Sequence, residues 1–75
     1  MLDSVRMKLF KQMWDELEGE RQEKLAKRCN TTRDYLYQVA NGYRKPSPKL
    51  SRKLEQETGI ARVEFRPDVF GELRA

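Results

Sequence analysis

The chain has 75 residues, 37% of them hydrophobic and 37% charged, with a formal charge of +4, so one small domain spanning residues 1–75 with a thin core is expected. One cysteine and no histidine exclude a disulfide within the chain and argue against a Cys/His metal site, which favours a reduced, cytoplasmic protein. The N-terminal residues lack an apolar signal-like region, and no apolar segment reaches the roughly 18 residues of a membrane span, so no membrane insertion is expected.

Positive charge is concentrated in the middle of the chain. Residues 24–53 contain nine basic residues against one acid, Asp34, and carry +8, whereas the remaining residues together carry −4. Such a polarised distribution favours a polyanionic partner. A solvated, lysine-rich surface is the alternative interpretation of the same charges.

The first expected helix follows Ser4, a favourable N-cap residue. Apolar residues then recur at four-residue spacing as far as Leu17, and Phe10 and Trp14 lie on the same side, so both aromatic side chains are expected in the core. Gly19 is expected to end this helix.

A second helix is expected to run to about Cys29, with Leu25, Ala26 and Cys29 on its apolar side. Its beginning is less clear from the sequence. The candidates for the N-cap are Gly19, Glu20 and Arg21, and none of them is a serine, threonine or asparagine.

The third expected helix spans residues 32–41. Asn30 tolerates the left-handed backbone conformation of a turn, and Thr32 can cap the helix that follows. Asp34 in the first turn complements the positive end of the helix dipole. Gly42 is expected to end the helix just after Asn41.

A fourth helix is expected from the N-cap Ser47, with Pro48 at its first position, to Gly59. The segment of about residues 60–75 is ambiguous. Val63 and Phe65 alternate as in a short strand, yet residues 61–66 fit one helical turn equally well, and Pro67 is expected to end whichever forms.

The third helix has two chemically different faces. Leu36, Val39 and Ala40 recur at core spacing, which turns the opposite side toward solvent. That outer side carries side chains able to contact base edges, because arginine pairs with guanine, glutamine with adenine and aspartate with cytosine. The predicted base contacts are Arg33, Asp34, Tyr37 and Gln38.

The sequence resembles the helix-turn-helix of lambdoid phage repressors and Cro proteins. The matching positions are Gln22, Ala26, Asn30, Thr31, Thr32, Leu36, Val39, Asn41 and Gly42. The tail EFRPDVFG, residues 64–71, is similar to the ending of Cro-like phage regulators and of YdaS-type antitoxins, which usually have leucine in place of Phe65. Two positions depart from the family pattern: Arg21 stands where a cap is usual, and Asn30 replaces the turn glycine.

The resemblance implies an all-α, lambda-repressor-like fold of four to five helices, with the helix-turn-helix at about residues 21–41. It also implies that Gln22, at the start of the second helix, contacts a phosphate. Together with the basic and polar residues around the third helix, the predicted contacts to the DNA backbone are Gln22, Lys27, Thr32, Asn41, Arg44 and Lys45.

These expectations combine into a sequence-specific regulator of transcription that binds double-stranded DNA as a homodimer, in the manner of a Cro-like repressor. The expected dimer contacts are Val63, Phe65, Val69 and Phe70, although these residues could instead cover the chain's own core. An antitoxin that binds a toxin protein and regulates its own operon is the alternative. No recognisable catalytic pair is present, so neither an enzyme, a cofactor nor a small-molecule substrate is expected.

Overall fold

The computed structural model describes residues 8–70, and every regular element within this range is a helix. The described helices are α2 (Lys8–Glu16), α3 (Gly19–Arg28), α4 (Arg33–Ala40), α5 (Pro48–Thr58), α6 (Arg62–Phe65) and α7 (Pro67–Phe70). The predicted all-α fold is therefore confirmed. Ser4, expected as the first N-cap, and residues 71–75 of the expected tail lie outside the described residues.

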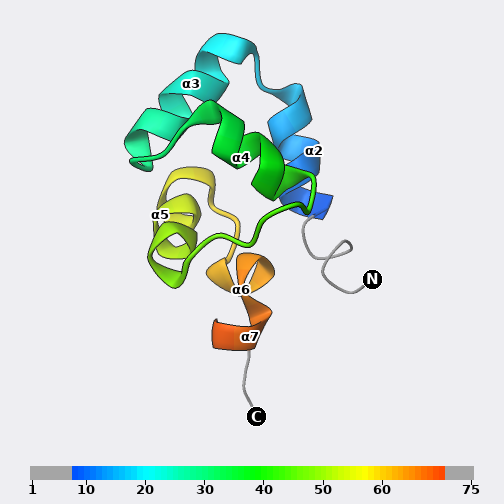
Figure 1. Ribbon diagram of the computed structural model, residues 1–75, viewed down its shortest axis with the longest axis vertical. Helices are drawn as coiled ribbons and strands as arrows, with labels where there is room; N and C mark the ends of the chain where they lie inside the picture. Colours follow the sequence, from blue (N-terminus) through cyan, green and yellow to red (C-terminus); the bar gives the residue numbers. More distant parts are fainter. Residues whose placement is uncertain (1–7, 71–75) are drawn as a thin grey trace.

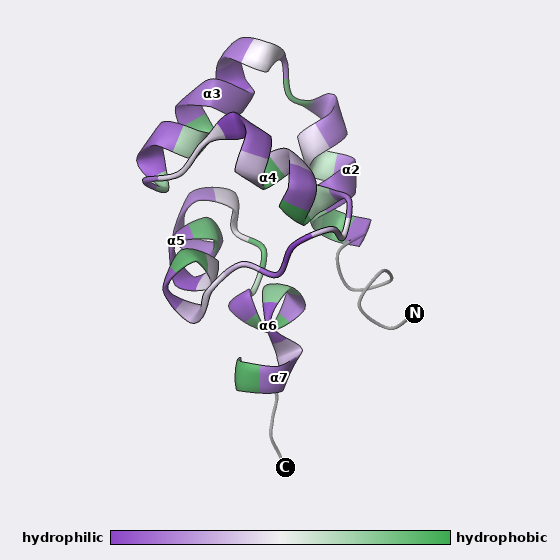
Figure 2. Ribbon diagram, in the orientation of Figure 1, coloured by the Kyte–Doolittle hydropathy of each residue, from purple (hydrophilic) through white to green (hydrophobic). Residues whose placement is uncertain are grey.

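The helices form two groups along the long axis of the molecule. α4 packs against both α2 and α3, whereas α5 packs against α6, which contacts α7. Figure 1 shows α2, α3 and α4 at one end, with α6 and α7 leading away from α5 toward the C-terminus. In Figure 2 most of α3 is hydrophilic, whereas hydrophobic residues stand out in α2, in α5 and at the end of α7.

An aromatic cluster connects α2 to α6. The rings of Phe10 and Trp14 lie 5.9 Å apart, and Phe65 meets Phe10 edge-on at 5.3 Å. Leu36 and Val39 from α4 are fully buried beside them. The core thus holds α4 against α2, and Phe65 of the tail completes it. This packing fixes which face of α4 points outward.

The expected caps form at α4 and α5. The Thr32 hydroxyl accepts a hydrogen bond from the Tyr35 backbone N–H, and the Ser47 hydroxyl accepts one from Leu50 N–H, both at 3.1 Å. Pro48 occupies the first turn of α5, and Gly59 ends that helix at a φ of 82°. These boundaries confirm the local signals in the sequence.

The beginning of α3 differs from the expectation. Its N-cap is Glu18, which precedes all three candidates, and Gly19 is already helical. The side chain of Glu18 makes no capping hydrogen bond, but its extended backbone lets its carbonyl accept from the Gln22 N–H at 2.9 Å. The helix therefore starts from backbone geometry without a capping side chain.

The tail after Gly59 is helical and contains no strand within the described residues. The Arg66 N–H donates to the Arg62 carbonyl at 3.0 Å, which closes α6 as a single turn. α6 ends directly before Pro67, as expected, with Arg66 as its C-cap. Pro67 itself begins α7, because the first helical position needs no N–H donor. The alternation of Val63 and Phe65 was therefore a misleading strand signal.

Phe65 was expected either at a dimer contact or in the chain's own core, and its burial favours the core. Its side chain is 3% exposed and packs in the core against Phe10. A residue buried in its own protomer has no surface to offer a second copy. Val63 and Phe70 are half-buried and Val69 is 47% exposed, so these three remain predictions as dimer contacts.

Replacing Phe65 should therefore destabilise the protomer itself. Phe65→Ala leaves a cavity beside Phe10 and is expected to lower the free energy of unfolding by about 3 kcal/mol or more. Val69→Ala, in the same tail but exposed, should change it by about 0.5 kcal/mol or less. Urea denaturation followed by circular dichroism measures both, and equal effects would contradict the burial of Phe65.

Candidate nucleic-acid interface

The turn between α3 and α4 sets the angle at which the two helices meet. Asn30 has a φ of 58°, the left-handed conformation expected from the sequence. The Thr31 N–H reaches back to the Ala26 carbonyl at 2.9 Å and the Asn30 N–H to the Lys27 carbonyl at 3.1 Å. These two bonds form a Schellman motif, so the last carbonyls of α3 are satisfied as the chain turns into α4.

The two faces of α4 separate as the periodicity predicted. Leu36, Val39 and Ala40 are buried. Arg33, Asp34 and Tyr37 are exposed, and Gln38 and Asn41 are half-buried on the outer side. The structure thus brings all four predicted base-contacting side chains to one side of a short helix, with Tyr37 50% exposed.

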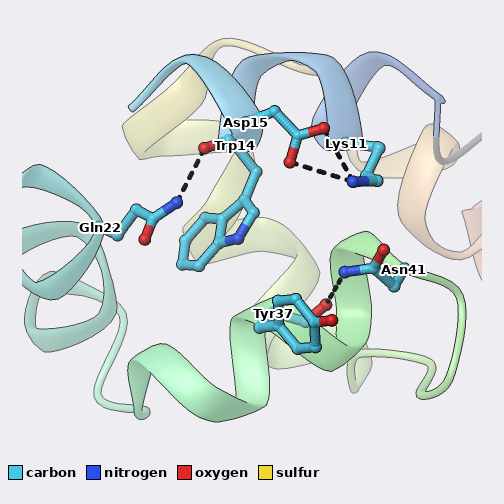
Figure 3. A network of polar contacts seen from close by, with 6 residues as sticks. All are labelled: Lys11, Trp14, Asp15, Gln22, Tyr37 and Asn41. Atoms are coloured by element: carbon cyan, nitrogen blue, oxygen red, sulfur yellow. Dashed lines mark hydrogen bonds and ion pairs between the residues drawn. The ribbon is translucent and has the colours of Figure 1, made fainter. Parts of the chain in front are cut away.

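Gln22 connects this outer face to the core. Its side chain is only 8% exposed, and its amide Nε2 donates to the backbone carbonyl of Trp14 at 2.9 Å (Figure 3). Its amide oxygen Oε1 accepts a hydrogen bond from Arg33 Nε at 2.8 Å. One glutamine therefore joins the end of α2, the first turns of α3 and the first residue of α4.

This link was not visible in the sequence, where Gln22 was assigned to a phosphate contact through the family resemblance. Its two partners stand 8 and 11 residues away along the chain, and no local pattern connects them. The predicted phosphate contact stays a prediction. The structural role of Gln22 is to hold the guanidinium of Arg33, which also lies near Gly19 at the start of α3.

A second set of contacts holds the loop after α4. Arg44 Nε donates to Gln38 Oε1 at 2.9 Å, and its guanidinium lies 6.0 Å from the centre of the Tyr35 ring. The Tyr35 hydroxyl in turn donates to the Lys45 carbonyl at 3.4 Å. The predicted backbone residues Arg44 and Lys45 are therefore placed beside the predicted base-contacting residue Gln38.

The remaining predicted backbone residues differ in what they can offer. Asn41 Nδ2 donates to the Tyr37 carbonyl at 2.8 Å, within its own helix (Figure 3). The exposed Thr32 hydroxyl accepts its capping bond and retains a proton to donate. Lys27 is exposed on α3. Thr32 and Lys27 thus flank the start of α4, while Asn41 mainly caps its end.

Acidic residues from α2 and α3 border the same surface. Asp15 and Glu23 line a surface hollow together with Arg33, Asp34 and Tyr37. Asp15 is paired with Lys11 at 2.8 Å (Figure 3). Because carboxylates repel phosphates, Asp15 and Glu23 make this edge of the surface less favourable for a polyanion than the edge formed by the basic loop after α4.

The described residues offer little for other chemistry. No group of histidine, cysteine or acidic residues between residues 8 and 70 could hold a metal ion. Burial raises the pKa of the Cys29 thiol, with a further increase from Glu57 that Lys53 opposes, so the thiol stays protonated at neutral pH. None of the helices described is long and apolar enough to cross a membrane.

Comparison with known proteins agrees with this geometry. The family described as helix-turn-helix matches residues 19–65, which include α3, α4 and the turn between them. A protein of Escherichia coli (strain K12) named "Prophage transcriptional regulatory protein" is 44% identical over 63 residues, covering 81% of this chain and 96% of that protein. No solved structure matches the chain.

Removing the Gln22 side chain should loosen both of its partners. Gln22→Ala deletes a buried hydrogen bond to the Trp14 carbonyl and is expected to lower the free energy of unfolding by about 1–3 kcal/mol. Glu23→Ala, its exposed neighbour on α3, is the matched control and should change stability by about 0.5 kcal/mol or less. Thermal melting of both variants provides the measurement, and an unchanged melting temperature for Gln22→Ala would argue against this link.

Proposed function

The chain belongs to the helix-turn-helix family, and from this premise we propose that it regulates transcription by inserting α4 into the major groove of double-stranded DNA. The observation that carries the proposal is the outer face of α4, where Arg33, Asp34, Tyr37 and Gln38 project away from a buried apolar side. A helix that contacted only phosphates would need only lysine and arginine side chains on this face. Donors and acceptors of mixed type instead suit base pairs, which present mixed patterns.

Arg33 is the residue best prepared for base recognition. Its Nε is engaged by Gln22 Oε1, which restricts the rotation of the guanidinium. The two terminal amino groups are the part of the fork that pairs with guanine O6 and N7. Because the side chain is already ordered in the absence of DNA, less conformational entropy is lost on binding.

Gln38 and Asp34 would add to this recognition at neighbouring base pairs. Gln38 lies about one helical turn after Asp34, and its Oε1 accepts from Arg44, so its amide nitrogen is the group left to donate to a base. Asp34 can accept from cytosine N4, the only base edge of the major groove that presents a lone donor. Tyr37 supplies exposed apolar area for a thymine methyl group.

The phosphates would be contacted on both sides of α4. Lys27 and Thr32 lie before this helix, and Arg44 and Lys45 lie after it. Such contacts would surround the helix that reads the bases, as in other helix-turn-helix proteins. Gln22 and Asn41, whose amides are engaged within the protein, would take part only through their remaining hydrogen-bonding capacity.

The family premise also supports a homodimer on a pseudo-palindromic operator, with half-sites about 34 Å apart. Val63, Val69 and Phe70 are the tail residues that could contact a second copy. Arg52 and Arg62 lie 5.5 Å and 5.1 Å from the centre of the Phe70 ring, so this aromatic side chain is already held in place. Occupation of the operator by such a dimer would repress transcription.

An antitoxin role remains the alternative, and it differs in requiring a partner protein. None of the contacts between residues 8 and 70 favours that partner over operator DNA. Repression by operator binding is therefore the function that the geometry supports best.

Arg33→Ala tests base reading directly. The substitution is expected to weaken binding to the specific site by about 1–3 kcal/mol and to relax the preference at one base pair. Competition binding against every single-base variant of the site measures this. An equal loss of affinity on random DNA would show that Arg33 contacts a phosphate only.

Lys45→Ala tests the backbone contacts. Specific and non-specific affinity are expected to fall together, and the slope of log K against log salt concentration should decrease in magnitude by about one. Lys8→Ala, which removes a positive charge from the exposed start of α2, serves as the control for net charge. A Lys45 variant with an unchanged slope would place this residue outside the interface.

A further inference from the structure

The Arg-Pro-Asp sequence of the tail makes a set of contacts that the proposed base recognition does not explain. We call the side chains of Arg66 and Asp68, with the Pro46 carbonyl, the clasp. Arg66 Nε donates to Asp68 Oδ1 at 2.9 Å, and Arg66 Nη2 donates to Asp68 Oδ2 at 2.7 Å, as a two-bond fork. The remaining amino group, Nη1, donates to the backbone carbonyl of Pro46 at 3.0 Å. The guanidinium therefore bridges the tail to a loop 20 residues earlier in the chain.

Pro46 belongs to the loop that carries Arg44 and Lys45, the predicted phosphate contacts. The front of this loop is fastened to α4, because the Tyr43 and Arg44 N–H groups donate to the Gln38 carbonyl at 2.8 and 3.3 Å. In its rear part the Lys45 carbonyl accepts a long hydrogen bond, 3.4 Å, from the Tyr35 hydroxyl. Arg66 provides a shorter bond there, to a proline that is almost completely buried.

The tail and the loop also share a packing surface. A cavity of about 60 Å³ is lined from one side by residues of the loop and from the other by residues of the tail: Gly42, Arg44, Lys45, Pro46, Glu64, Phe65 and Pro67. The loop therefore lies directly against residues of α6 and the first residue of α7. Displacing the tail would leave this part of the loop without its neighbour.

We propose that Arg66 and Asp68 are positioning residues for DNA binding, which hold the loop of residues 42–46 so that Arg44 and Lys45 meet the phosphates. This inference rests on the proposed function. Asp68 orients the guanidinium, the guanidinium holds the Pro46 carbonyl, and the loop presents the two cations. Neither Arg66 nor Asp68 needs to touch DNA for this effect.

The clasp persists at physiological pH. Hydrogen bonds from Arg66 lower the pKa of the Asp68 carboxyl to about 2 from its usual value near 3.8, and the positive charges of Arg66 and Lys45 contribute further. Because the folded-state pKa is the lower one, the stabilisation is complete above about pH 4 and is lost as the pH falls through about 2. Asp68 therefore stays ionised wherever the protein would encounter DNA.

Asp68→Ala gives a test in which a positioning role and an effect of net charge predict opposite changes in DNA affinity. Removing an acid near Lys45 should strengthen binding to a polyanion if charge alone matters. Positioning instead predicts binding to the selected operator about three- to tenfold weaker, with a smaller salt slope. Asp15→Ala, which removes an ion-paired and exposed carboxylate from α2, is the matched control and should not weaken binding.

Arg66→Lys supplies a second variant that leaves the net charge unchanged. Lysine cannot form the planar fork and also reach the Pro46 carbonyl, so a similar loss of affinity is expected. In a Lys45→Ala background the effect of Asp68→Ala should shrink, because both changes act through the same loop. Additive effects, or an Asp68→Ala variant that binds as tightly as the unaltered protein, would overturn the inference.

Amide hydrogen exchange of the DNA-free protein tests whether the clasp holds the loop, independently of whether the protein binds DNA. Asp68→Ala should accelerate exchange at Tyr43 and Arg44 while leaving Leu36 in α4 unchanged. Unchanged exchange at Tyr43 and Arg44 would overturn the clasp even if the unaltered protein binds its operator. Conversely, faster exchange in a protein that shows no DNA binding would refute the proposed function and, with it, the role of the clasp in binding.

Discussion

The candidate interface depends on the side-chain amide of Gln22. Its nitrogen satisfies the Trp14 carbonyl near the end of α2, and its oxygen holds Arg33 at the start of α4. Because a buried amide must find partners for both ends, the glutamine fixes three helices relative to one another. The orientation of Arg33 is therefore set by the protein interior and is available before any ligand arrives.

The opposite end of α4 is organised by a different kind of contact. There, Arg44 bonds to Gln38, and Arg66 reaches from the tail to the Pro46 carbonyl. α4 is thus supported at its first residue by the core and beyond its last residue by the tail. A helix of eight residues has little stability of its own, so these supports define its position.

Local chemistry explains which features could be predicted from the sequence. Asn30, Thr32 and Ser47 act on backbone groups within a few residues, and each takes the conformation that its residue type favours. Phe65 could not be assigned in the same way, because an apolar side chain suits core packing and a dimer contact equally well. Only its contact with Phe10, far along the chain, decides between them. Gln22 and Arg66 likewise take their roles from partners far along the chain.

Selection from a random pool of double-stranded DNA at physiological salt tests the central claim most directly. If α4 reads bases from a two-fold dimer, sequencing of the retained DNA will show a symmetric motif with half-sites about one helical turn apart. Retention without enrichment of any sequence would contradict the account, because the basic surface would then supply affinity for phosphates and nothing more.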